Sequence, residues 1–518
     1  MAGRQTLKFS SLIAVILCGK QNTSKQEACM DKKKTINRRL EKAAEHVSSL
    51  WFPFNMEIVH SIRAKHEEGA YDNDVRTLIE DLRKDFALFS FVVKHLIPTA
   101  KEVGLSDESI QNPITLLSWA GSDRICSIFQ NDSDLPNNHL LESLESFQAD
   151  RLRETTIIAS TAEVLGEKKN LDSSEGFCAG IIREIGLNLI AWNYPTMFGR
   201  VIKSLPEGVS LEKRLTEELG FSPALLAIRV LHSSESSDTQ QVDGDTSLIS
   251  KTYDQLCEIG AALARAEHPE RYPSAEHDWE HAQSYLKETI GQGAIDLIRE
   301  RALERSQEYE SSLSTLFTSL QEFNPELQIK DHRKKRASKR NKYLPQCPKE
   351  VQAALKSLYA LMGSVDTTRD VLESLVREVF PDAGFTGGCV FVIDPASISL
   401  SPRTVFGSVK LRDIRPVALN VAATDAETNL LYTENIISQH YSSDLAATAL
   451  ACTQPVIARG SAQEDSGVTG MYGSLGENRK VGVLYLESNE KAQFDEEQQD
   501  IITFKAVRQA LADALYLD

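Results

Sequence analysis

The strongest apolar pattern in the chain runs from Phe177 to Trp192. Apolar residues recur there every three or four positions, which places them on one face of a helix, and further isoleucines widen that face. A helix with such a broad apolar face is expected at the centre of a helical bundle. The residues of this face are Phe177, Ile181, Ile182, Ile185, Leu189, Ile190 and Trp192.

Helical periodicity also covers most of the chain before residue 325. The segment 31–48 reads as a basic, solvated helix that ends at Trp51-Phe52-Pro53, and Pro98 should end another helix. We expect Ser210 to cap the helix at 208–220 and Gly220 to end it. The other predicted helices cover residues 74–85, 86–97, 109–121, 139–165, 249–267, 275–290 and 293–322.

The pattern changes class after residue 350. A helix is predicted over 351–380 and another over 496–515. Between them lie short runs of β-branched residues bounded by Gly, Pro, Asp and Ser, which is typical of strands. These runs cover 387–394, 403–409, 454–459 and 481–487. The sequence therefore predicts an all-α bundle followed by an α+β domain.

Two polar segments interrupt these patterns. Residues 232–247 are rich in Ser, Asp and Gly, and we expect a mobile loop there. Residues 332–342 carry many Lys and Arg side chains without apolar periodicity, and Pro345 and Pro348 follow. This basic segment could contact nucleic acid or an anionic membrane, but its composition favours an exposed interdomain linker whose like charges repel one another.

At 518 residues, the chain is too long for one core. We predict an N-terminal extension with a basic helix at 1–49, a helical domain at 50–325, a basic linker at 326–349 and an α+β domain at 350–518. Residues 1–20 resemble a signal-peptide core without a cleavage site, and we interpret residues 1–29 as a non-native or upstream extension, with Met30 as a second start. No membrane span is expected.

Composition narrows the function further. The net charge of −17 argues against nucleic-acid binding by the whole molecule, because such binding needs a basic surface. The eight cysteines are widely spaced and form no CxxC, so we expect reduced thiols in a cytoplasmic protein and no zinc site. We expect no cofactor.

Residues Ala179 to Gly186 read Ala-Gly-Ile-Ile-Arg-Glu-Ile-Gly. This segment resembles the A-G-L-L-H-D-I-G signature of the HDOD proteins, relatives of the HD-type metal phosphohydrolases. The His-Asp pair of that signature is replaced here by Arg183 and Glu184. The nearest counterparts of other family histidines are Glu154 or Thr155, and Pro223. Because Arg can neither lose its proton nor bind a metal, the resemblance implies a degenerate site with no catalytic or metal-binding residues.

The end of the chain resembles a GAF domain. The residues concerned are Val481-Gly-Val-Leu-Tyr-Leu-Glu487 and Phe494-Asp-Glu-Glu-Gln-Gln-Asp500, followed by an alanine-rich helix. The resemblance implies a central antiparallel sheet flanked by helices, which binds a small ligand or forms a homodimer through those helices. The ligand-binding residues stay unknown. The two resemblances together predict a non-enzymatic bacterial signal-transduction protein with an unidentified protein partner.

A second hypothesis is an active metal-dependent hydrolase. His277-Asp-Trp-Glu-His281 fits the pattern H-x-x-E-H, in which two His side chains bind zinc and the Glu acts as a base. In this hypothesis His277 and His281 are ligands and Glu280 is the base, or an atypical HD site serves instead. The predicted helix is charged on all sides and offers no obvious third ligand, so we favour the non-enzymatic interpretation.

Overall fold

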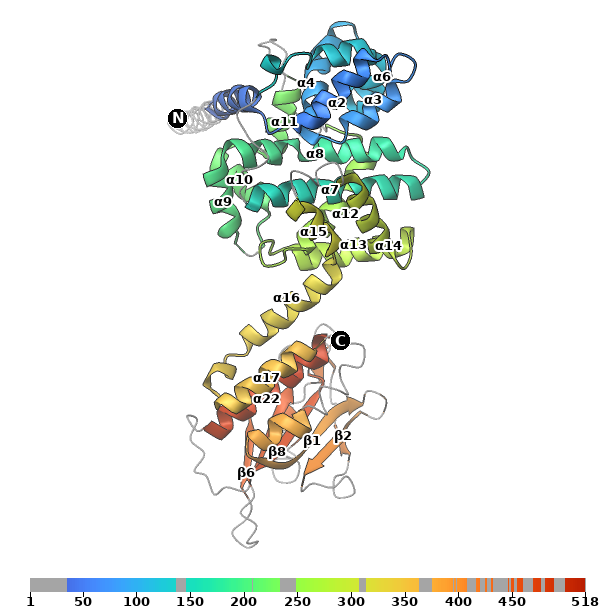
Figure 1. Cartoon of the computed structure of the whole chain (residues 1–518). Coiled ribbons are helices and arrows are strands. Elements are labelled where there is room, and N and C mark those ends of the chain that lie inside the picture. Colours follow the sequence, from blue (N-terminus) through green and yellow to red (C-terminus); the bar gives the residue numbers. More distant parts are fainter. Residues whose placement is uncertain are drawn as a thin grey trace, which may run out of the picture. The chain divides into compact units, whose positions relative to one another are not determined.

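The computed structural model divides the chain into two compact units, Met1–Ile329 and Lys330–Asp518, and each is described by itself (Figure 1). The described residues are 35–136, 146–206, 208–232, 248–306, 314–362, 375–394, 396, 398–407, 416–419, 424–425, 430–431, 446, 449–450, 454–459, 469–476, 480–488 and 499–517. The predicted loop at 232–247 lies outside these residues from 233 onward.

The described residues of the N-terminal unit form helices joined by turns and irregular segments, with no strand among them. The first described residues, 35–50, form a helix. The elements that follow are α2 (Met56–Glu67), α3 (Val75–Leu82), α4 (Phe86–Glu102), α5 (Asp107–Gln111), α6 (Pro113–Ser127), η1 (Asp132–Asp134), α7 (Ser146–Lys168), α8 (Ser173–Asn193), α9 (Pro195–Lys203), α10 (Leu211–Leu219), α11 (Pro223–Leu231), α12 (Lys251–Ala266), α13 (Ala275–Thr289), α14 (Ala294–Ser306) and α15 (Ser314–Gln321).

Helices α7 and α8 form the centre of this unit, with α2, α3, α4 and α6 on one side and α12 to α14 on the other (Figure 1). The apolar residues predicted to face the core, from Phe177 to Trp192, are all buried. Small residues let the central helices approach closely: a Cβ added at Gly180 would lie 2.5 Å from the Cα of Ala159 on α7. The prediction of a central α8 is therefore confirmed.

The structure agrees with the predicted caps of α10 but not with the predicted end of α4. The Ser210 side chain accepts a hydrogen bond from Lys213 N at 3.2 Å, and Gly220 ends α10 with φ +85°, so both predicted caps are confirmed. The prediction that Pro98 ends a helix is wrong, because α4 continues through it to Glu102. Burial of Ala100 beyond the proline helps offset the lost backbone hydrogen bond.

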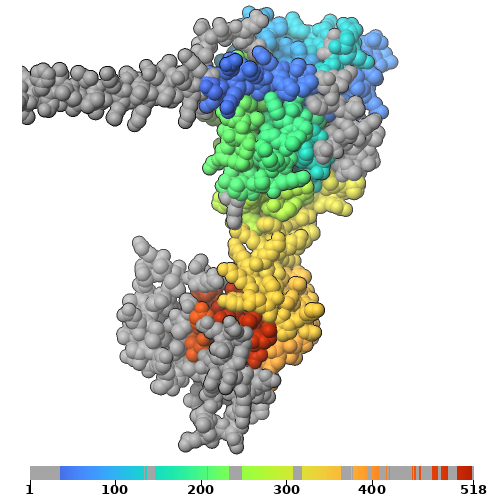
Figure 2. Space-filling model, turned by 90° about the vertical axis from the view of Figure 1, so that its left-hand side faces the viewer, coloured from blue at the N-terminus to red at the C-terminus, as the bar shows by residue number. Residues whose placement is uncertain are grey.

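The helix at 35–50 corrects a second prediction. We expected it to be solvated, yet one of its faces, formed by Leu40, Ala43, Ala44 and Val47, is buried in the core of the unit. Arg229 on α11 also pairs with Glu41 at 3.5 Å. In Figure 2 this helix, in dark blue, lies against the green surface that includes α11. Small apolar residues alternate with charged ones along this helix, so the sequence pattern did not predict a buried face.

The basic segment also differs from its prediction. Residues 332–340 are not irregular but form the C-terminal half of α16 (Pro325–Arg340). Ala337 and Asn341 are buried, and Asn341 Nδ2 donates to the carbonyl oxygen of Ala506 at 2.8 Å. The predicted linker is therefore not free at Ala337 and Asn341, which are packed within the C-terminal unit.

The C-terminal unit contains an antiparallel sheet in the order β3-β2-β1-β8-β7-β6. The strands are β1 (Phe385–Asp394), β2 (Ser399–Gly407), β3 (Val417–Ala418), β6 (Val456–Arg459), β7 (Thr469–Leu475) and β8 (Gly482–Ser488), and β4 (Thr424–Asp425) pairs separately with β5 (Leu430–Leu431). The helical elements are η4 (Leu344–Gln346), α17 (Lys349–Leu361), η5 (Leu375–Val379), α19 (Phe380–Asp382) and α22 (Gln499–Leu517). The predicted combination of an all-α region and an α+β region is confirmed.

Helices α17 and α22 pack on one face of this sheet, where Leu355 and Phe504 share a core with Leu484. Sequence reasoning missed β7, which contains two glycines. The structure explains one of them, because a Cβ on Gly473 would lie 2.9 Å from the ring of Phe504. Close packing of α22 thus requires a residue that weakens the strand pattern.

Candidate functional site

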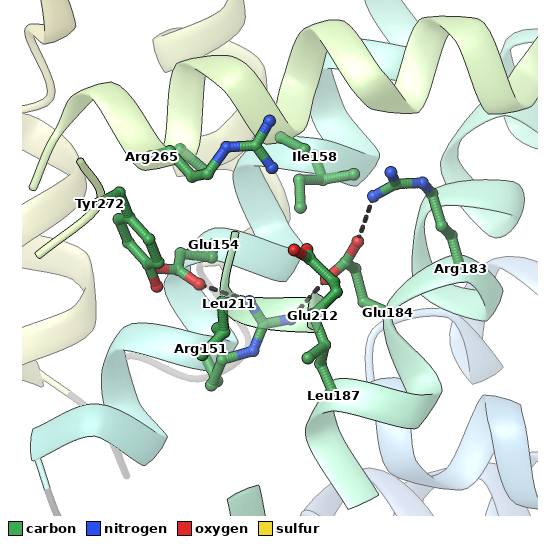
Figure 3. Close-up of a pocket in the computed structure, with 12 residues that line it drawn as sticks. Arg151, Glu154, Ile158, Arg183, Glu184, Leu187, Leu211, Glu212, Arg265 and Tyr272 are labelled. Atoms are coloured by element: carbon green, nitrogen blue, oxygen red, sulfur yellow. Dashed lines mark hydrogen bonds and ion pairs between the residues drawn. The ribbon is translucent and has the colours of Figure 1, made fainter. Parts of the chain in front are cut away.

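Of the replaced pair on α8, Glu184 is buried in the N-terminal unit, and Arg183 beside it is partly exposed (Figure 3). The residues around it come from α7, α8, α10 and α12 and from the turn before α13. They line a small cavity of about 20 Å³. The lining residues are Arg151, Glu154, Ile158, Arg183, Glu184, Leu187, Leu211, Glu212, Ala261, Ala264, Arg265 and Tyr272.

Glu184 is 2% exposed and accepts hydrogen bonds from two guanidinium groups. Arg151 Nη2 lies 2.5 Å from its Oε2, and Arg183 Nη1 lies 2.6 Å from its Oε1 (Figure 3). Burial by itself would raise the pKa of this carboxyl group, but the two guanidinium groups outweigh burial and hold the pKa below its ordinary value. Glu184 is therefore an ionised carboxylate whose two oxygens are both engaged.

Arg183 is held by three carboxylates. Besides Glu184 it pairs with Glu258, and its Nε lies 3.3 Å from Asp254 Oδ1. Both of these acids lie on α12. Burial favours loss of the proton, but the carboxylates dominate and raise the pKa of Arg183 above its ordinary value. Arg183 is thus a fixed cation that ties α8 to α12, and it has no lone pair for a metal.

Arg151 extends the network to α7. This buried guanidinium lies between Glu184 and Glu154, and Tyr272 Oη donates to Glu154 Oε1 at 2.7 Å. Thr155, the other predicted counterpart of a family histidine, pairs with Asn188, whose Nδ2 lies 3.2 Å from the Thr155 hydroxyl. Glu154 and Thr155 therefore both lie beside α8, and both are engaged in hydrogen bonds within the protein.

The third counterpart, Pro223, does not line this cavity. It begins α11, and its backbone carbonyl packs directly against Gly186. The cavity itself has room for about one water molecule, since a water needs roughly 10–15 Å³ measured in this way. The arrangement can order a buried helix junction, but it offers no space for a phosphoester.

The structure places the alternative site elsewhere. His277, Glu280 and His281 lie on the exposed side of α13, whose opposite side is buried through Trp279 and Ala282. Asp278, the acid of the literal His-Asp dipeptide, pairs with Arg265 at 3.1 Å. Within the described part of the chain, no cluster of three or more His, Cys, Asp or Glu residues has a geometry that could hold a metal ion.

Sequence reasoning missed Arg151 and Tyr272. The Arg151–Glu154 spacing of three residues is visible in the sequence, but the same spacing is common on solvated helices and carries no sign of burial. Tyr272 follows a Glu-Arg dipeptide in a turn and gives no periodic signal. A prediction of these two partners would have required the packing of α7 against α8.

The described cysteines, Cys126, Cys178, Cys257, Cys347 and Cys389, are buried free thiols. Burial raises the pKa of Cys126 and of Cys389 to about 12, so neither is a ready nucleophile. None of the described helices is long and apolar enough to cross a membrane.

Comparison with known proteins adds no further constraint. No protein-family model, no curated protein and no solved structure matches this chain.

Proposed function

We propose that this chain is a non-enzymatic signal-transduction protein, in which a degenerate HD-type helical scaffold of the HDOD kind is coupled to a GAF-like sensor domain. The observation that carries the proposal is the position of Arg183. This side chain lies where the resemblance would put a metal-binding histidine, and its charge is balanced by Glu184, Asp254 and Glu258.

The retained and the replaced parts of the signature differ in their physical roles. Gly180 allows α8 to approach Ala159 on α7, and Gly186 allows it to approach Pro223 on α11. These glycines serve packing. The two positions that would serve metal chemistry now form ion pairs within the protein. A sequence that keeps the packing residues and loses the ligands is expected for a scaffold.

Electrostatics also oppose metal binding in this cavity. A divalent cation beside Arg183 would be repelled by a fixed positive charge, and it would have to take Glu184 away from two guanidinium groups. Breaking such a buried pair leaves an uncompensated charge and typically costs about 3–5 kcal/mol.

The sensor half of the proposal concerns the C-terminal unit. One sheet face is covered by α17 and α22, and the other carries a second apolar cluster that includes Cys389, Phe391 and Val483. A sheet with an apolar cluster on each face can enclose a small ligand on one side while the flanking helices relay the change. We propose this second face for the ligand, which acts by shifting the population of conformations.

The test of the scaffold half is metal content and phosphodiester hydrolysis. The purified full chain should contain no stoichiometric zinc, iron or manganese, and it should hydrolyse bis(p-nitrophenyl) phosphate at the buffer rate in Mn²⁺. A His277→Ala/His281→Ala double variant is the matched control, because both residues are exposed. Hydrolysis by the wild-type chain would refute the proposal, and its loss in the double variant would establish the alternative site.

The test of the sensor half is native mass spectrometry of the full chain purified from cells. We expect a bound small molecule that is released on mild unfolding, and added ligand should then alter hydrogen exchange in both units. A ligand that protects only residues outside 385–488 would contradict the proposed face.

A further inference from the structure

The second half of α16 presents a cluster of positive charge on the C-terminal unit. Residues 332–342 contain seven Lys and Arg residues and no acid, in a chain whose net charge is −17. The segment buries Ala337 and Asn341 on one side, and Lys335 and Lys339 lie on the opposite side of the helix. The exposed cations of the segment, which we call the basic patch, are Lys335, Lys339, Arg340 and Lys342.

The other cations of the segment differ from the basic patch in their surroundings. Arg333, Lys334 and Arg336 are partly buried. Lys334 Nζ lies 3.5 Å from Asp331 Oδ1, and it donates to the carbonyl oxygen of Ala360 in the last turn of α17 at 3.2 Å. These contacts give Lys334 a role within the unit. By contrast, no residue of the basic patch forms an ion pair with a carboxylate among the described residues.

Helix stability does not explain the whole basic patch. Positive side chains in the last turn interact favourably with the carbonyl groups at the helix end, which accounts for Lys339 and Arg340. Lys335 lies before that turn. Lys339 follows it one turn later, where two like charges repel each other by about 0.2–0.5 kcal/mol. A polyanion bound from outside would remove this repulsion.

We propose that the basic patch binds the phosphate backbone of double-stranded DNA without sequence preference. A duplex carries about one negative charge per 1.7 Å of its axis, so several phosphates can meet the patch at once. Lys335 and Lys339 are separated by about 6 Å along the helix axis, a distance that a few phosphates span. Because the side of α16 at Ala337 is buried, only one side of the helix meets the DNA, as expected for a helix that lies along the backbone rather than in a groove.

The composition of the basic patch favours duplex DNA over other polyanions. The patch contains no aromatic ring on which the bases of a single strand could stack, and no amide or hydroxyl group for the 2′-hydroxyl of RNA. It also contains no apolar side chain for insertion into a membrane, and the exposed Leu327 lies roughly 12 Å before Lys335 along the helix. A flat anionic membrane would in addition face the acidic remainder of the chain, whereas a duplex is a narrow rod that can contact the patch alone.

The experiment measures the fluorescence anisotropy of a labelled DNA duplex of about 20 base pairs, titrated with the full chain at 50–150 mM KCl. We expect a Kd of about 10 μM or tighter at 50 mM KCl. Four cations that each displace a counterion predict a slope of about −3.6 for the logarithm of the association constant against that of the salt concentration. Binding should therefore weaken about 50-fold over this range, and a single strand of the same length should bind more weakly than the duplex.

Lys335→Gln tests the basic patch, and Lys213→Gln is the matched control, because Lys213 is exposed on α10 of the N-terminal unit and the change in net charge is the same. Lys335→Gln should weaken binding about tenfold at 50 mM KCl and reduce the slope by about 1, whereas Lys213→Gln should leave both unchanged. Far-UV circular dichroism should show that both variants fold like the wild type, since both side chains are exposed.

Three results would overturn the proposal: no binding of the duplex at 50 mM KCl, equal losses in the two variants, or tighter binding of the single strand than of the duplex. Flotation with phosphatidylserine vesicles at the same salt concentration tests the membrane as partner. We expect the chain to stay unbound there, and vesicle binding without duplex binding would assign the patch to a membrane instead. The proposal does not rest on the proposed signalling function.

Discussion

The contact between α7 and α8 allows a sharp test, the substitution Gly180→Ala. An added Cβ would lie 2.5 Å from the Cα and 2.9 Å from the amide nitrogen of Ala159. These are backbone atoms, so no side-chain rotation can relieve the overlap, and the two helices must move apart. Because both helices are buried along almost their whole length, that movement disturbs the centre of the N-terminal unit.

The magnitude follows from two opposing effects. Overpacking a core costs about 1–3 kcal/mol, and the upper end applies where backbone meets backbone. Replacing Gly by Ala within a helix returns about 1 kcal/mol of helix propensity. We therefore expect Gly180→Ala to lower the free energy of unfolding by about 2 kcal/mol. At about 2–4 °C per kcal/mol for a large domain, Tm should fall by about 4–8 °C.

Gly166→Ala is the matched control. Gly166 is also buried within α7, but its nearest neighbour to an added Cβ is the carbonyl oxygen of Asp172 at an ordinary 3.6 Å. This variant should be as stable as the wild type or up to about 1 kcal/mol more stable. The assay is thermal and urea unfolding of the full chain followed by far-UV circular dichroism. Equal stability of the two variants would refute the idea that Gly180 serves close helix packing.

Three further predictions concern charge and backbone conformation. Glu184→Gln should destabilise the N-terminal unit by about 3–5 kcal/mol at pH 7 in urea unfolding, because it leaves buried guanidinium charge without its partner. Glu258→Gln removes a 55% exposed partner of Arg183 and should cost less than about 1 kcal/mol. Equal losses in the two variants would contradict a stabilising role for the buried Glu184 ion pairs. Since the folded-state pKa of Glu184 is lowered, its contribution is present above its ordinary pKa and should be lost as pH falls below it. Burial raises the pKa of Asp85 to about 6, so its ionised form is disfavoured in the folded state. Its contribution to the free energy of unfolding should therefore rise by about 2 kcal/mol as pH falls from 7 to 4, and the difference between wild type and Asp85→Asn in urea unfolding should change by that amount over this range. Gly220→Ala should lower the free energy of unfolding by about 1–2 kcal/mol, because φ is +85° at this position. Gly220→Asn should cost less, because Asn tolerates this conformation better. Thermal unfolding measures both, and an Ala variant as stable as the wild type would show that α10 does not end in a left-handed residue.

The periodicity of the chain determined a large part of the fold. A broad apolar face from Phe177 to Trp192 requires burial on several sides, which fixed α8 at the centre of a helical unit. The caps at Ser210 and Gly220 are local hydrogen-bonding and φ preferences, which a sequence states directly. Short β-branched runs bounded by turn-forming residues likewise indicated β1 and β8, but this signal missed the glycine-containing β7.

Only the tertiary structure decided what surrounds the replaced pair. The sequence shows Arg183 and Glu184, but it does not show that Arg151, 33 positions before Glu184, shares the same carboxylate. Ion-pair partners depend on the packing of α7, α8 and α12, and that packing depends on close approaches such as the one at Gly180. Long-range packing likewise decided that α16 continues through the basic segment, because its far end is buried at Ala337. Periodicity describes one helix at a time, whereas a buried charge is satisfied by residues on its neighbours.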